Sequence, residues 1–155
     1  MIEVIEIPVF LSDLEYASDL FQNCNLVDAE LNAMKYYIYS LNENKEIIYY
    51  FFEINETIED PSILDRLIPK TPFCFIFLMG QTFIVNNFCE SYKERYNTPL
   101  FCLKPKVKSD FDTTYITNNL LKNEHNQLIE FIPENASGLR DVMISSFDLL
   151  LKNQR

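Results

Sequence analysis

Short apolar runs alternate with amphipathic stretches along almost the whole chain. Runs rich in aromatic and β-branched residues predict strands, because such side chains suit a pleated, half-buried surface. Stretches whose apolar residues recur every three or four positions predict helices, because those positions share one helical face. The predicted strands are residues 2–11, 35–39, 47–54, 73–79, 100–103 and 128–132. The predicted helices lie within 12–24 and at 61–68, 84–96, 114–122 and 139–150.

The order of these elements predicts an α/β fold in three layers. Strands that alternate with helices form a mainly parallel sheet with helices on both faces. The polar turn at residues 42–45 separates two strand patterns and predicts one β-hairpin at 35–54. We therefore expect a six-stranded, mostly parallel sheet with one antiparallel hairpin at its edge. The length, and the absence of a repeat or linker, predict a single domain over residues 1–155.

Composition and charge narrow the classes of partner. The chain is 48% hydrophobic, which supports a packed core. Its formal net charge is −10, and residues 1–77 carry 14 acids against 4 bases. Such acidity lacks the electrostatic footprint of a nucleic-acid binder, so we expect no nucleic-acid partner. The acidic first half would attract a basic partner, or would serve solubility alone.

Metal, cofactor and membrane roles find no support in the sequence. The four cysteines form no C-x-x-C pair and the single histidine, His125, has no ligand-type neighbour, so we expect no metal and no cofactor. The longest apolar runs are too short to span a bilayer. The early acids Glu3 and Glu6 are unlike a signal peptide. We therefore expect an intracellular protein of the cytoplasm, with the nucleus left open, and no membrane insertion.

Three segments after or around buried strands in the second half follow a familiar pattern. Residues 98–103 read TPLFCL, residues 108–110 read KSD, and residues 130–138 read EFIPENASG. They resemble, in order, the strand before the guanine-reading motif of Ras-like small GTPases, the end of the N-K-x-D motif, and the S-A-K loop with its strand. The family's six strands, five helices and single hairpin also resemble the predicted order. The resemblance covers nearly the whole chain as topology, and as sequence residues 99–151.

The nucleotide-binding motifs of that family are all altered here. Residues 9–18 should hold the phosphate loop G-x-x-x-x-G-K-[ST], yet they contain neither glycine nor lysine, and Ser12 and Glu15 instead have the spacing of a helix capping box. The strand before the D-x-x-G motif ends at Glu53, and no glycine follows it there. The altered motif positions are Ser12, Asp13, Glu53, Val107, Lys108, Asp110, Asn135, Ala136 and Ser137.

The guanine-reading residues are incomplete in either alignment. If Asp110 matches the motif aspartate, Val107 replaces its asparagine; a shift of two residues puts Lys108 at the aspartate. Asn135, Ala136 and Ser137 keep only the alanine of S-A-K. The resemblance therefore implies a GTPase-like domain that is not an enzyme. Degenerate relatives serve as subunits of trafficking, cytoskeletal-motor and kinetochore assemblies, so it implies a scaffold or adaptor with protein partners.

A tyrosine-rich hairpin is the candidate partner surface. Aromatic residues are enriched at protein interfaces, and edge strands offer unpaired backbone groups to another chain. Alternate residues of a strand face opposite sides, so some of these rings should be less covered than a central core. The candidate contact residues are Tyr36, Tyr37, Tyr39, Tyr49 and Tyr50. The competing interpretation is ordinary packing within the hairpin.

Two other functions stay open at this point. One is an unconventional small GTPase that binds nucleotide through unusual loops and acts as a switch. The other is a small enzyme on another doubly wound α/β fold, with Cys102 as nucleophile and His125 as base. A phosphorelay receiver fits less well: residues 103–105 resemble its lysine-proline turn, but no aspartate follows the third strand.

Overall fold

The computed structural model describes residues 2–13, 26–28, 35–54, 61–106, 111–131 and Ser146. The helices predicted within 12–24 and at 139–150 lie outside this part of the chain, apart from Ser12, Asp13 and Ser146. The motif positions from Val107 to Asp110 and from Asn135 to Ser137 are also outside it.

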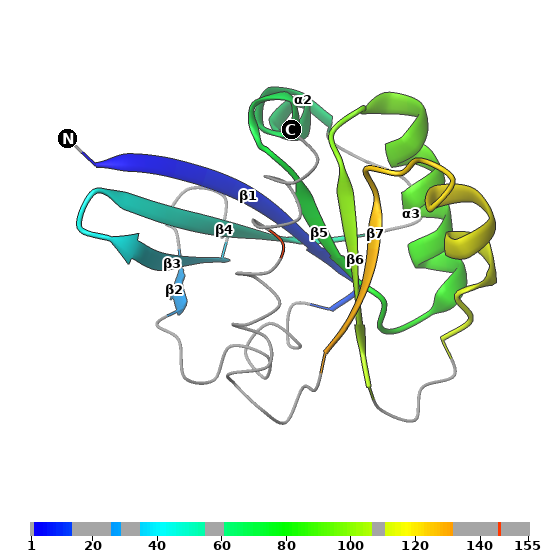
Figure 1. The fold of residues 1–155 in the computed structure, drawn as a ribbon. Coiled ribbons are helices and arrows are strands. Elements are labelled where there is room, and N and C mark those ends of the chain that lie inside the picture. Colours follow the sequence, from blue (N-terminus) through cyan, green and yellow to red (C-terminus); the bar gives the residue numbers. More distant parts are fainter. Residues whose placement is uncertain are drawn as a thin grey trace.

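Five strands form a parallel sheet in the centre of the molecule (Figure 1). They are β1 (Glu3–Leu11), β4 (Lys45–Glu53), β5 (Cys74–Phe77), β6 (Leu100–Pro105) and β7 (Gln127–Phe131). Their order is β4-β1-β5-β6-β7, and each neighbouring pair is parallel. Continuous apolar sequence explains β5 and β6, which are buried on both faces. The predicted α/β fold with a mainly parallel sheet is confirmed.

Two antiparallel strands extend the sheet beyond β4. Strand β3 (Lys35–Asn42) pairs with β4, with Ile38 opposite Ile48, and β2 (Leu26–Asp28) pairs with the other side of β3. The described residues therefore form seven strands, and the prediction of six was wrong. The hairpin also does not lie at the edge, because β2 covers β3. A three-residue strand is too short for a period of two to be recognised, so β2 could not be predicted from the sequence.

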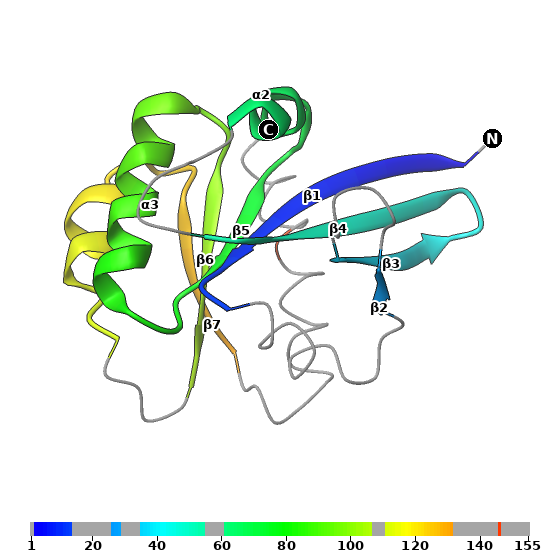
Figure 2. The same cartoon turned by 180° about the vertical axis from the view of Figure 1, so that it is seen from behind.

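The helices that the structure describes pack on one face of the sheet (Figure 2). They are α2 (Pro61–Leu67), the 3₁₀ turn η1 (Ile68–Lys70), α3 (Thr82–Arg95) and the π-helical segment η2 (Ile116–Leu120). Phe10 of β1 lies at the centre of this layer, and its ring centroid is 4.7 Å from that of Phe88 on α3. Since this layer covers one face only, the predicted three-layer arrangement stays a prediction.

The opposite face of the sheet holds a second apolar cluster. Tyr49 of β4 stacks on Phe75 of β5, and Phe73 stacks on Phe101 of β6 with 4.7 Å between ring centroids. These four rings are at most 1% exposed. Aromatic side chains bury large areas, so this cluster and the one around Phe10 supply much of the hydrophobic stabilisation.

Strand β1 is the point at which the sheet order reverses. Its neighbours are β4 on one side and β5 on the other, so the chain winds outward in both directions from it. In open α/β sheets, ligands bind outside the carboxyl ends of the strands at such a switch point. The carboxyl ends of β1 and β5 are therefore the place where this fold would bind a nucleotide or other ligand.

Candidate functional site

Protein groups occupy the carboxyl end of β1. Ser12 follows the last residue of the strand, and its hydroxyl donates a hydrogen bond of 3.0 Å to the backbone oxygen of Met79, after β5. Gly80 comes next, with a φ of 86°, and a Cβ atom there would collide with the Ser12 hydroxyl. Only glycine adopts this φ readily. Ser12 and Gly80 thus fit together at the switch point of the sheet.

Two acidic side chains lie near the carboxyl end of β1 among the residues that the structure describes. Asp13 is half-buried beside Ser12, and Glu53 is exposed at the end of β4, opposite Leu11 of β1 in the strand register. Carboxylates at this point would repel the phosphates of a nucleotide. Whether Ser12 also caps a helix depends on residues 14–25, which lie outside the described part.

The structure describes the side chains of three of the five candidate tyrosines, and these lie on two faces of the sheet. Tyr49 is 1% exposed and belongs to the aromatic cluster, so its assignment to a partner surface was wrong. It shares a face with Ile47 and Phe51, whereas the next residue, Tyr50, points to the opposite face. Tyr50 and Tyr36 are half-buried and lie opposite each other, with ring centroids 6.1 Å apart. The side chains of Tyr37 and Tyr39 lie outside the described part.

A groove of about 750 Å³ lies at the amino ends of the strands. One wall is the first half of β1 with Tyr50 of β4, and the other is α2 with the residues after it. Glu6 lies on the strand wall, whereas Arg66 and Lys70 lie on the helix wall. Burial, and then the negative charge of Glu6, raise the pKa of the Tyr50 phenol. This groove could not be predicted from the sequence, because β1 and α2, which form its walls, are about 60 residues apart in the chain.

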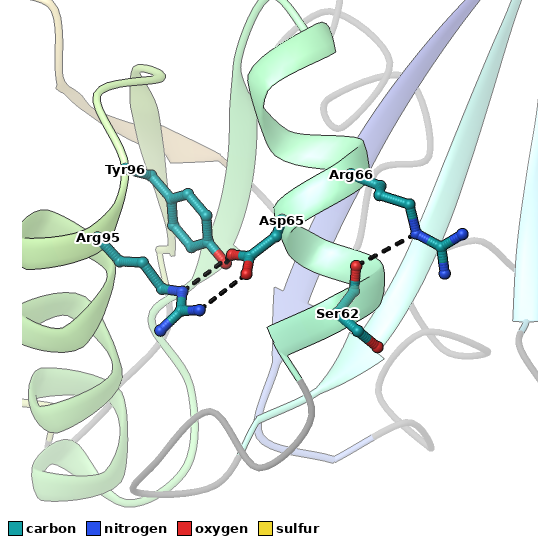
Figure 3. Close-up of polar contacts among 5 residues, drawn as sticks. All are labelled: Ser62, Asp65, Arg66, Arg95 and Tyr96. Atoms are coloured by element: carbon teal, nitrogen blue, oxygen red, sulfur yellow. Dashed lines mark hydrogen bonds and ion pairs between the residues drawn. The ribbon is translucent and has the colours of Figure 1, made fainter.

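The polar contacts of Asp65 join α2 to the end of α3 (Figure 3). Arg95 donates two hydrogen bonds to the Asp65 carboxylate, from Nε at 2.9 Å and from Nη2 at 2.8 Å. The Tyr96 hydroxyl donates a third at 2.7 Å. The hydrogen bonds from Arg95, and then that from Tyr96, lower the pKa of Asp65 to about 2. On the opposite side of α2, the Nε of Arg66 donates to the backbone oxygen of Ser62.

The contribution of Asp65 to stability should depend on pH in a defined direction. Its folded pKa lies below the ordinary value, so the stabilisation is present above about pH 4 and is lost as the pH falls toward 2. We expect Asp65→Asn to lower the melting temperature at pH 7, with the difference from the wild type shrinking between pH 5 and pH 2. Thermal melts across this range measure it. A difference in melting temperature that stays constant with pH would contradict the role given to the Asp65 carboxylate. Because Arg95 and Asp65 act as a pair, adding Arg95→Gln to Asp65→Asn should lower the melting temperature little further.

The described cysteines are buried and poorly suited to nucleophilic chemistry. Cys74, Cys89 and Cys102 are 0% exposed. Burial raises the pKa of Cys74 and of Cys89 to about 12, and it raises that of Cys102 well above its ordinary value. The thiolate is the reactive form of cysteine, and burial disfavours it. Cys102 is therefore a poor nucleophile for the proposed pairing with His125, whose side chain is exposed.

Within the described residues, no three acidic, histidine or cysteine side chains come together in a way that could hold a metal ion. None of the helices that the structure describes is long and apolar enough to cross a bilayer.

Comparison with known proteins adds no family assignment. No protein-family model matches the sequence. A search of curated proteins found none with significant similarity to it.

Proposed function

We propose that this chain is a GTPase-like domain that neither binds nor hydrolyses GTP, and that it acts as a scaffold or adaptor subunit through contacts with other proteins. Its setting would be an intracellular assembly of the trafficking, cytoskeletal or kinetochore type. The observation that carries the proposal is the packing of Ser12 against Met79 and Gly80 at the switch point of the sheet.

The arrangement of strands supports the GTPase-like part of the proposal. Six of the seven strands, β3, β4, β1, β5, β6 and β7, match the number that the sequence resemblance implies. The antiparallel hairpin β3–β4 lies on one side of β1, and β5, β6 and β7 lie on the other, so β1 is in the middle of the sheet. Strand β2 is an addition to this pattern.

The chemistry at the carboxyl end of β1 supports the loss of nucleotide binding. A phosphate loop surrounds its anion with backbone N–H groups, which requires glycines, and a lysine then reaches the terminal phosphates. Here the chain after β1 begins with Ser12, whose hydroxyl is bonded to Met79, and continues with the carboxylate of Asp13. The segment after β1 therefore lacks, in residues 9–18, the glycines and the lysine with which a phosphate loop holds a triphosphate.

A constitutive partner is the functional consequence of this loss. In active relatives, the hairpin side of the fold changes with the bound nucleotide and contacts effectors. Without a nucleotide, that side keeps one conformation. Tyr36 and Tyr50 are only half-buried there, and Ile38 is 40% exposed, so the hairpin retains accessible apolar surface for a partner.

Purification of the tagged chain from its native cells tests this function. We expect the same partner proteins to be recovered in EDTA, in GDP with magnesium, and in a non-hydrolysable GTP analogue with magnesium. The reason is that no nucleotide state exists to change the contact surface. The matched control is a bona fide small GTPase treated in parallel, whose effectors should depend on the analogue. A partner of this chain that is recovered in one nucleotide condition only would contradict the proposal and favour the switch.

A further inference from the structure

One part of the sheet has an apolar surface that none of the described helices covers. Val4 and Glu6 of β1 alternate with Ile5, which is partly buried, and Ile7, which is buried, so they share the face that Phe10 presents to α3. The strand register brings β4 and β3 residues onto the same face. We define the open sheet face by these residues: Val4, Glu6, Tyr36, Ile38, Glu46, Ile48 and Tyr50.

Exposure shows that this face is accessible. Val4 is 46% exposed and Ile38 is 40% exposed, and both are among the exposed large apolar residues of the described chain. In Figures 1 and 2, the amino end of β1 and the β3–β4 hairpin extend beyond the helices. The β1–β4 pair is parallel, and parallel sheets are normally covered on both faces. The helices that the structure describes thus cover this face of the sheet only as far as α2.

The groove beside α2 lies where one further helix would pack next to α2 on the sheet. Its strand wall includes Val4 and Tyr50, and its helix wall includes Ile63 and Leu67 of α2. Arg66 lies on the side of α2 away from Asp65 and α3, as Figure 3 shows. A helix laid on the open sheet face would contact apolar groups from the sheet below and from α2 at its side.

Charge distinguishes the sheet from α2 on this surface. Glu6 lies on the strand wall of the groove and Glu46 of β4 lies beside Val4, whereas Arg66 and Lys70 lie on the helix wall. We propose that the open sheet face and the adjoining groove bind an amphipathic helix of a partner protein. This helix carries lysine or arginine along the edge that lies over β1 and β4, called the sheet-side edge, and acidic residues along the edge that faces α2. This inference rests on the proposed scaffold function and names the partner's chemistry.

A second copy of the chain fits this surface poorly. The formal net charge of −10 makes two copies of the chain repel each other. Like charges opposed at an interface disfavour association. A partner helix with the proposed edges gains electrostatic attraction from Glu6 and Glu46, and its apolar stripe covers Val4, Ile38 and Ile48.

A displayed library of helical peptides tests the proposal with a defined probe. Each peptide has about 18 residues, roughly five turns, with leucines along one stripe and Lys, Glu or Gln at random on both flanks. We expect selection on the full chain to enrich peptides with Lys on one flank and Glu on the other. Ile38→Asp should weaken their binding roughly tenfold or more, because it replaces a buried apolar contact with a charge. Phe83→Asp is the matched control: Phe83 is 51% exposed on α3 and should have no effect.

A charge reversal makes the test independent of the apolar substitution. Glu6→Lys should weaken the selected peptides about threefold and should shift a new selection toward Glu on the sheet-side flank. Thermal melts verify that each variant is folded. Absence of enriched peptides, or equal loss with Ile38→Asp and Phe83→Asp, would overturn the proposal. So would a dimer in sedimentation that Ile38→Asp dissociates. Nucleotide binding would overturn the scaffold function instead, and it is measured separately.

Discussion

Gly80→Ala is expected to lower the free energy of unfolding by about 2–5 kcal/mol. The backbone of Gly80 has a φ of 86°, and a residue with a Cβ pays about 1–2 kcal/mol in the left-handed region. The new methyl group would also collide with the Ser12 hydroxyl, and overpacking of this kind costs about 1–3 kcal/mol. Denaturant unfolding of both proteins measures the difference.

The overpacking contribution to this loss of stability depends on the Ser12 hydroxyl, which allows a sharper test. In a Ser12→Ala background the hydroxyl is gone, so Gly80→Ala should lose part of its effect and retain the cost of the backbone conformation. We expect a coupling energy of about 0.5–3 kcal/mol between the two substitutions. The single variant Ser12→Ala is the control, and it should cost about 0.5–1.5 kcal/mol through its lost hydrogen bond to Met79. Strict additivity would show that Ser12 and Gly80 do not contact each other.

The pattern of apolar residues predicted the central strands because burial constrains their sequence strongly. β5 and β6 are covered on both faces, which selects for continuous runs such as Phe73–Met79. β2 was missed because Leu26, Val27 and Asp28 have no distinctive period, and their pairing with β3 is decided by tertiary contacts. The position of the hairpin inside the sheet follows from that same pairing, so it could not be predicted either.

The candidate site was less predictable than the fold. The identity of Ser12 and the lack of glycines were visible in the sequence, but the partner of its hydroxyl is Met79, 67 residues away. The tyrosines show a similar limit. Alternation predicts that Tyr49 and Tyr50 face opposite sides, but only the packing of the sheet shows that the Tyr49 side is the covered one. The groove depends on how far α2 lies from β1, which no local pattern encodes.

The two ends of the sheet therefore differ in their chemistry. At the carboxyl end of β1, Ser12 packs against Gly80, with the acids Asp13 and Glu53 nearby. At the amino end, the groove beside α2 presents apolar groups together with both signs of charge. The open sheet face beside this groove is where we propose that a partner protein binds.

Loss of guanine-nucleotide binding is the largest effect that we expect relative to a working small GTPase. Charge-assisted hydrogen bonds are worth about 1.5–3 kcal/mol each, and the phosphate loop, the D-x-x-G glycine and the guanine-reading pair are all altered. The loss of several such contacts moves a tight site beyond about millimolar affinity, since each 1.4 kcal/mol is about tenfold. The acidic groups Asp13 and Glu53 would weaken binding further.

Titration calorimetry of the full chain with GTP and GDP in the presence of magnesium is the most direct measurement of this claim. ATP under the same conditions is the control for non-specific binding of polyanions, and a thermal melt verifies that the protein is folded. We predict no saturable heat for either guanine nucleotide up to about 1 mM, as for ATP. Saturable, magnesium-dependent binding of GTP or GDP at micromolar concentration would contradict the account.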